Sequence, residues 1–185
     1  VYYGLCMLFV IGGLYGFMGG GLFGLALECS EKHPVQWAVL GTQMIAAGLL
    51  IYGLFIYQWE WLMTPPRSEA WAGCLGMAIA LLWYMKREQY HAALRVAICA
   101  GIGAGFGFAF GNFLQVLGKF QEVAFNFWNV MEYSLGFFGG IGMAYGVFSS
   151  TWKVGSSQKT SQGHLLAFLL LALFIPLVIW TQSFT

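Results

Sequence analysis

The sequence predicts an all-α integral membrane protein with about six transmembrane helices. Of its 185 residues, 59% are hydrophobic and only 8% are charged, whereas a soluble domain has roughly 45–50% apolar and 25% charged residues. The mean hydropathy is +0.73. The charged residues gather in short clusters between long apolar runs. A transmembrane β-barrel would instead show segments of about 10 residues with alternating polarity, so the unbroken apolar runs favour helices.

A helix that crosses the bilayer core needs about 20 mostly apolar residues, and three such helices are expected in the first half of the chain. The first covers residues 1–27 and ends at a polar loop that begins with Glu28. The second covers residues 35–57, and the Pro65–Pro66 pair that follows cannot continue a helix. The third, at residues 70–85, is shorter and stops at a Lys-Arg-Glu triplet.

Three more helices are expected in the second half. The fourth covers residues 96–117 and the fifth covers residues 123–148. A stretch rich in Ser, Gln and Lys, residues 149–162, separates the fifth helix from the last one. The sixth helix covers residues 165–182 and contains Pro176, where a kink is expected.

The basic residues predict the orientation of these helices. They are concentrated in the loops after the first, third and fifth helices: Lys32, Lys86, Arg87, Arg95, Lys153 and Lys159. By the positive-inside rule these loops face the cytoplasm, and both ends of this chain lie outside. We therefore expect a multi-pass protein of a bacterial-type inner (plasma) membrane, with the lipid bilayer as its main partner.

Two helices carry the same ladder of residues. Glycines spaced four apart precede a longer polar side chain in both: Gly16, Gly20, Gly24 and Glu28, then Gly103, Gly107, Gly111 and Gln115. This predicts one transmembrane domain, residues 1–185, built from a duplicated unit with halves 1–88 and 89–185. Because each half holds three helices, the halves would form a 3+3 inverted-topology repeat. The alternative is that any two glycine-rich membrane helices look alike.

The glycine ladders also predict which helices pack closely. Small residues let membrane helices approach one another, since lipid provides no hydrophobic force that draws them together. Several glycines occur in each of the first, second, fourth and fifth helices. We expect these four to form an inner bundle, with the third and sixth helices outside it.

Polar side chains within the apolar runs are the candidate transport or ligand residues, because polar groups in a membrane usually face a partner or a wet cavity. Asn129, Glu132 and Tyr133 are spaced to share one face of the fifth helix, as Asn112 and Gln115 do on the fourth. We expect these two stripes to meet. Gln43 and Glu28 would form a counterpart cluster at the other side of the membrane. Two alternatives are that Glu28 is a solvated helix end and that Glu132 only bonds neighbouring side chains.

Several classes of protein are excluded or disfavoured. A net charge of +1 with few, scattered basic residues disfavours a nucleic-acid partner. Four cysteines without a CxxC pair, and three histidines in or beside loops, predict no metal site and no haem or other cofactor. The chain contains no Asp and no GxSxG, HExxH or Walker sequence, so an enzyme is not expected.

Two functions rank ahead of a third, a membrane enzyme that modifies lipids. The first is a small-solute or ion transporter with its pathway between the first, second, fourth and fifth helices and Glu132 as the main ionisable group. The second is a non-catalytic membrane subunit, or a membrane domain of a larger protein, that packs partner helices or forms a homo-oligomer. The sequence does not begin with Met, which favours the second hypothesis.

Overall fold

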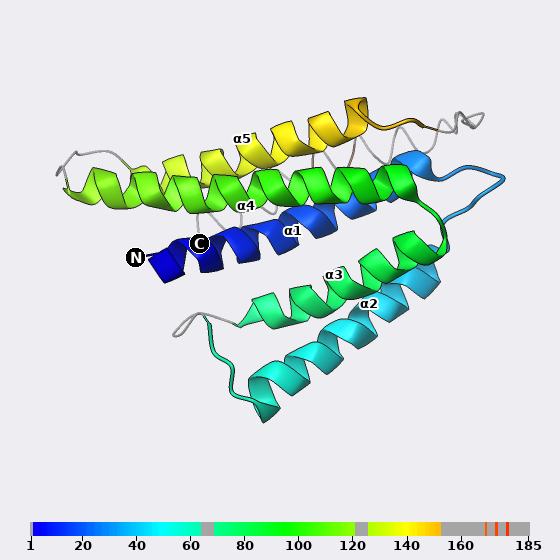
Figure 1. The fold of residues 1–185 in the computed structure, drawn as a ribbon, viewed down its shortest axis with the longest axis horizontal. Helices are drawn as coiled ribbons and strands as arrows, with labels where there is room; N and C mark the ends of the chain where they lie inside the picture. The colour runs from blue at the N-terminus through cyan, green and yellow to red at the C-terminus, as the bar shows by residue number, and fades with distance from the viewer. Residues whose placement is uncertain are drawn as a thin grey trace. The chain divides into compact units, whose positions relative to one another are not determined.

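The computed structural model describes residues 2–63, 69–120 and 126–152, together with Leu169, Leu173 and Leu177 (Figure 1). The elements of this part of the chain are α1 (Tyr2–Glu28), α2 (Trp37–Tyr52), η1 (Gly53–Gln58), α3 (Ala70–Arg87), α4 (His91–Phe120) and α5 (Phe127–Phe148). Element η1 is a π-helix that directly continues α2. The chain divides into two compact units, Val1–Lys153 and Val154–Thr185, and all of these elements belong to the first.

Three of the helices are long and apolar enough to cross a membrane: Gly4–Glu28, Trp37–Gln58 and His91–Phe120. The predicted all-helical character and the five helices before residue 150 are therefore confirmed. Two boundaries differ, because α4 begins five residues before its predicted start and α5 begins four residues after its own. Polar residues in α3 and α5, such as Arg87 and Glu132, lower their hydropathy, and neither helix is among the three. The predicted helix at 165–182 lies outside the described residues.

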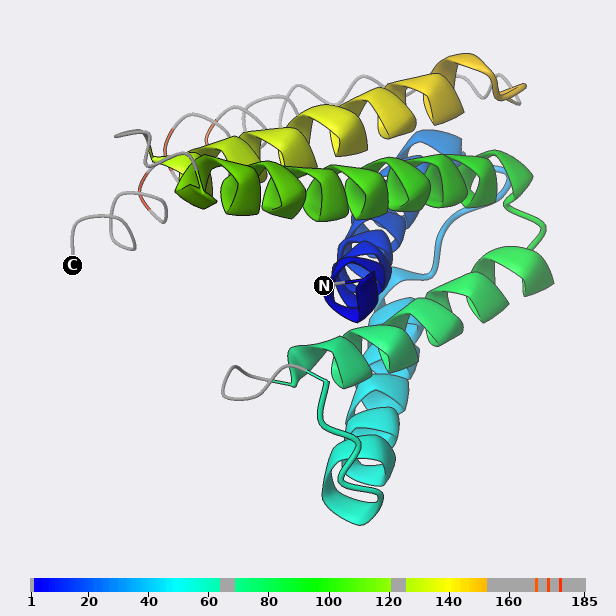
Figure 2. The same cartoon turned by 60° about the vertical axis from the view of Figure 1, so that its left-hand side comes forward.

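Helix α4 is the centre of the first unit, since α1 and α5 both pack along it (Figures 1 and 2). Glycines of α1 face alanines of α4. A Cβ added at Gly24 would lie 2.7 Å from the Cα of Ala93, and one added at Gly12 would lie 2.8 Å from the carbonyl oxygen of Ala104. Such distances are too short for real side chains, so these backbones touch only because both residues are glycine.

A second face of α4 makes the same kind of contact with α5. Here the glycines belong to both helices. A Cβ at Gly111 would lie 2.7 Å from the Cα of Met131, and one at Gly146 would lie 2.7 Å from the Cα of Val96. Helix α4 therefore carries two adjacent seams of small residues, one for each neighbour.

The expected inner bundle of the first, second, fourth and fifth helices is wrong in one respect. Helix α2 packs mainly against α3, and it is α3 that contacts α1 (Figure 2). The α2–α3 seam also uses glycines, because a Cβ at Gly48 would lie 3.1 Å from the carbonyl oxygen of Gly73, and one at Gly76 would overlap the backbone of Ala47. The small residues of α3, Gly73 and Gly76, thus give this helix a packing surface for α2.

The packing does not confirm the inverted repeat. In such a repeat the α4–α5 contact of the second half would have an α1–α2 counterpart in the first. Helix α5 packs extensively on α4, whereas α2 packs on α3 rather than on α1. The six spans are likewise not confirmed, because among the described residues only the three helices given above meet the length and hydropathy that a span needs.

The close approach of α1 and α4 leads to a prediction about stability. A Cβ at Gly16 would lie 2.5 Å from the Cβ of Ala104, whereas nothing lies within 4 Å of a Cβ at Gly19. We expect Gly16→Ala to lower the free energy of unfolding by about 1–3 kcal/mol through overpacking. Gly19→Ala should leave it unchanged or raise it by up to about 1 kcal/mol, since Ala is the better helix former. Detergent-solubilised protein unfolded by heat or SDS checks both, and equal effects would contradict the α1–α4 seam.

Candidate functional site

The predicted polar face of α5 points away from α4. Tyr133 is 74% exposed and Glu132 is exposed. In the part of the chain that the structure describes, nothing lies within 4 Å of a Cβ added at Gly136 or Gly140. The carboxylate of Glu132 accepts a hydrogen bond from the indole N–H of Trp128 at 2.7 Å. The expectation that this face meets α4 is wrong, because α5 carries a second set of small residues, ending in Gly146, that makes the contact instead.

Asn112 and Gln115 do lie together on α4. The amide nitrogen of Asn112 donates to the side-chain oxygen of Gln115 at 3.3 Å, and it also lies 4.0 Å from the sulfur of Met131 on α5. The residue that α5 presents to this pair is thus Met131 and not Glu132. Asn129 is exposed and accepts a hydrogen bond from Asn126, just before α5 begins, at 3.4 Å. The expected cluster of the α4 and α5 stripes does not form.

Glu28, the last residue of α1, bonds to the N-terminal end of another helix, α4. Its carboxylate accepts a hydrogen bond at 2.8 Å from the backbone N–H of Ala93, in the first turn of α4. A carboxylate at this place satisfies one of the free N–H groups and interacts favourably with the helix dipole. Glu28 therefore joins α1 to α4 and is not simply a solvated helix end.

Gln43 does not join Glu28 in a cluster. Its side-chain oxygen is buried and has no hydrogen-bond partner among the described residues. Its neighbour Thr42 donates to the carbonyl oxygen of Ala38 within α2, at 2.9 Å. Of the predicted candidates, only Asn112 and Gln115 bond to each other. The roles of all seven as ligand residues remain predictions.

Aromatic side chains connect the loop after α1 with the turn between α3 and α4. The ring of Tyr90 stacks on His33 with the ring centroids 4.3 Å apart, and its hydroxyl donates to the carbonyl oxygen of His33 at 3.2 Å. The hydroxyl of Tyr84 accepts from the backbone N–H of Gln36 at 2.9 Å. We call this end of the unit, which also holds Glu28, the loop end. His33 is thus part of a packed cluster, although the sequence suggested only a solvated loop.

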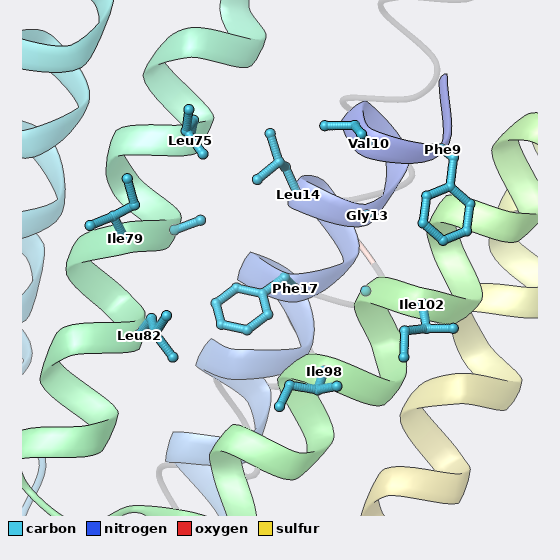
Figure 3. A pocket seen from close by; sticks show the side chains of 12 residues that line it. Phe9, Val10, Gly13, Leu14, Phe17, Leu75, Ile79, Leu82, Ile98 and Ile102 are labelled. Carbon is cyan, nitrogen blue, oxygen red and sulfur yellow. The ribbon is translucent and has the colours of Figure 1, made fainter. Parts of the chain in front are cut away.

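An apolar groove of about 410 Å³ lies between α1, α3 and α4 (Figure 3). Phe17 and Leu14 of α1, Ile79 and Leu82 of α3 and Ile98 of α4 are among its lining residues. Figure 3 shows side chains from all three helices directed toward the space between them. The groove offers no ionisable group, so it suits an apolar chain and not a solute that needs polar contacts.

A second, smaller hollow of about 330 Å³ is polar. It lies at the loop end, where the start of α4 meets the end of α5, and its lining residues are Glu28, Gln89, His91, Ala92, Arg95, Ser150, Thr151 and Trp152. The imidazole of His91 is hydrogen-bonded to the side chain of Gln89 at 2.8 Å. Among the described residues, no three His, Cys, Asp or Glu side chains gather where they could hold a metal ion.

Sequence reasoning missed Glu69, which precedes α3 and is only 7% exposed. Its carboxylate accepts hydrogen bonds from the indole N–H of Trp71 at 2.6 Å and from the backbone N–H of Met63 at 3.0 Å. The rings of Trp61 and Phe55 also contact Trp71. A signal was present, since this acidic residue stands among tryptophans at the ends of two apolar runs. These contacts join η1 and the residues just after it to the start of α3.

Comparisons with known proteins give one match. Residues 89–166 resemble the family DUF3464, whose description is "Photosynthesis affected mutant 68". The described residues of this range are the turn before α4, the hairpin of α4 and α5, and the first residues after it. No curated protein and no solved structure matches the chain.

The bond between Glu28 and Ala93 predicts a measurable contribution to stability. Glu28→Ala should lower the free energy of unfolding by about 1 kcal/mol, because α4 loses the acceptor at its N-terminus. Glu28→Gln keeps an acceptor oxygen without the charge, so its free energy of unfolding should lie between those of the wild type and Glu28→Ala. The exposed Glu31 supplies the control, and Glu31→Ala should have no effect. Thermal unfolding in detergent measures all three, and equal stability of wild type and Glu28→Ala would refute this role.

Tyr90 predicts a loss of stability at high pH. Burial, with smaller contributions from Tyr84 and nearby acidic groups, raises the pKa of Tyr90 to about 12 from its usual 10. The folded state thus favours the neutral phenol. Its contribution, about 2 kcal/mol, should be complete below pH 10 and should disappear as the pH rises to 12. We expect the stability difference between wild type and Tyr90→Phe to shrink over this interval, and denaturant titrations at each pH measure it. A constant difference would contradict the prediction.

Proposed function

We propose that this chain is a non-catalytic membrane protein whose α5 packs against a helix of another membrane protein, as a subunit or membrane domain of a larger assembly. The observation that supports this most strongly is the pair of small-residue stripes on α5. One stripe, which includes Gly142 and Gly146, lies against the α4 backbone. The other, Gly136 and Gly140, has the same spacing, but no atom of the described residues lies within 4 Å of a Cβ added there.

The side chains that flank the open stripe fit the same role. Tyr133, Phe137, Ile141 and Tyr145 are all at least half exposed. Glycines that leave a shallow channel between large side chains form the packing surface that transmembrane helices use. Aromatic residues are enriched where membrane proteins meet partners, because they provide large contact areas at low entropic cost.

The transport hypothesis has less support. Its pathway required α1, α2, α4 and α5 to surround a common space, but α2 packs mainly on α3. Glu132, its main ionisable group, lies on the outer face of α5 and is bonded to Trp128. The groove beside α1 and α4 is apolar. No observation in the described residues favours a route for a polar solute.

A second proposal concerns the membrane in which the protein resides. The matched family is described by a mutant in which photosynthesis is affected, and the match covers the α4–α5 hairpin. This supports a photosynthetic membrane rather than the bacterial-type plasma membrane expected from the sequence. The partner of α5 would then be a membrane protein that takes part in photosynthesis.

The proposal predicts cross-links from α5 to another chain. A photo-reactive phenylalanine analogue placed at Tyr133 should cross-link in native membranes to a membrane-spanning peptide of a different protein, identified by mass spectrometry. Tyr57, on η1, is also 74% exposed and is the matched control position. The identity of the cross-linked partner also tests the photosynthetic location.

The variant Gly140→Ile separates partner binding from folding. Because none of the described residues lies within 4 Å of a Cβ at this position, the fold should keep its stability while the cross-link from position 133 is lost. A cross-link from position 133 to residues 165–182 of the same chain would refute the proposal, because that segment would then cover α5. Equal cross-linking from positions 133 and 57 would also refute it.

A further inference from the structure

The apolar groove between α1, α3 and α4 leads toward basic side chains at the loop end. On α3, Leu75, Ile79 and Leu82 line the groove, and Lys86 follows at the spacing that keeps it on the same face. Lys86 is exposed in the last turn of α3. This face of α3 therefore changes from aliphatic to cationic within about one helical turn.

On α4 the same change from aliphatic to cationic side chains occurs, but it runs from the middle of the helix toward its N-terminus. Ile102 and Ile98 line the groove, and Arg95 and His91 continue the same face toward the start of the helix. The turn Glu88–Tyr90 connects α3 to α4, so Lys86 and Arg95 lie at the same end of the two helices. Of the three helices that border the groove, α3 and α4 thus each carry a cation beyond its apolar lining, at the same end.

These two cations are available to a ligand. Among the described residues the one ion pair joins Arg87 to Glu88, with 2.8 Å between its atoms. Arg95 shares the polar hollow with Glu28, but the carboxylate of Glu28 is bonded to the N–H of Ala93. The end of the groove therefore has an excess of positive charge.

We propose that the groove holds an acyl chain of an anionic phospholipid and that Lys86 and Arg95 bind its phosphate headgroup. The aliphatic lining matches the chain, and the charge at the end of the groove matches the head. A partner helix fits the space less well, because a helix with its side chains is about 10 Å wide and the groove encloses only about 410 Å³. This inference concerns a different surface from the open face of α5.

Native mass spectrometry of the full chain tests the site. The protein in mild detergent is titrated with dioleoyl phosphatidylglycerol and, separately, with dioleoyl phosphatidylcholine, which differ in headgroup charge but share their chains. We expect one molecule of the anionic lipid to bind at least tenfold more tightly. Excess glycerol phosphate should not displace it, because the headgroup alone lacks the groove contact. Equal affinity for the two lipids, or displacement by glycerol phosphate, would overturn the proposal.

Two sets of variants assign the two parts of the ligand. Removal of each cation, as Lys86→Gln and Arg95→Gln, should weaken phosphatidylglycerol binding about fivefold, whereas Lys119→Gln, near the opposite end of α4, should not. Ile79→Trp fills the groove and should weaken binding of both lipids. Ile141→Trp is its control, since both isoleucines are 50% exposed. Unchanged binding in Ile79→Trp or in Lys86→Gln/Arg95→Gln would overturn the proposal, because all of these positions are exposed and tolerate substitution.

Discussion

The close contact of helix backbones at glycine is the constraint on which the first unit depends. Three separate seams, α1–α4, α4–α5 and α2–α3, place a glycine where any Cβ would collide with the opposite backbone. Lipid surrounds apolar side chains as well as another helix does, so burial of large residues adds little to the association of helices in a membrane. Close packing and its many dispersion contacts replace it. This explains why the core of this unit is rich in Ala and Gly.

The position of α4 follows from the same constraint. It is the helix with small residues on two adjacent faces, alanines toward α1 and glycines toward α5, and only such a helix can pack closely on two neighbours. Helix α3 has fewer small residues, and it contacts α1 less extensively than it contacts α2. The looser α1–α3 contact leaves the apolar groove beside α1, which is lined mainly by large aliphatic and aromatic side chains of α1, α3 and α4.

The sequence was sufficient to locate the five helices before residue 150, because runs of apolar residues bounded by charge or proline are local features. It was not sufficient to choose their partners. Helix α5 has glycines at 136 and 140 and again at 142 and 146, and both pairs have the spacing of a packing stripe. Only the shape of α4 decides between them. Glu28 shows the same limit, since its partner Ala93 is 65 residues away in the sequence and nothing local distinguishes it from a solvated helix end.

The two ends of the unit differ in a way that bears on function. At the loop end, Tyr90, Tyr84 and Glu28 join three segments through hydrogen bonds between side chains and backbone. The bonds of Glu28 and Tyr84 each satisfy a backbone N–H near the start of a helix. At the other end of the unit, aromatic rings and the hydrogen bond between Trp71 and Glu69 instead join the segment after α2 to the start of α3. Polar and ionisable groups that could meet a headgroup or a solute are thus concentrated at the loop end. The open stripe of α5, Gly136 and Gly140, offers only shape, so a partner that binds there must be recognised by the fit of one helix against another.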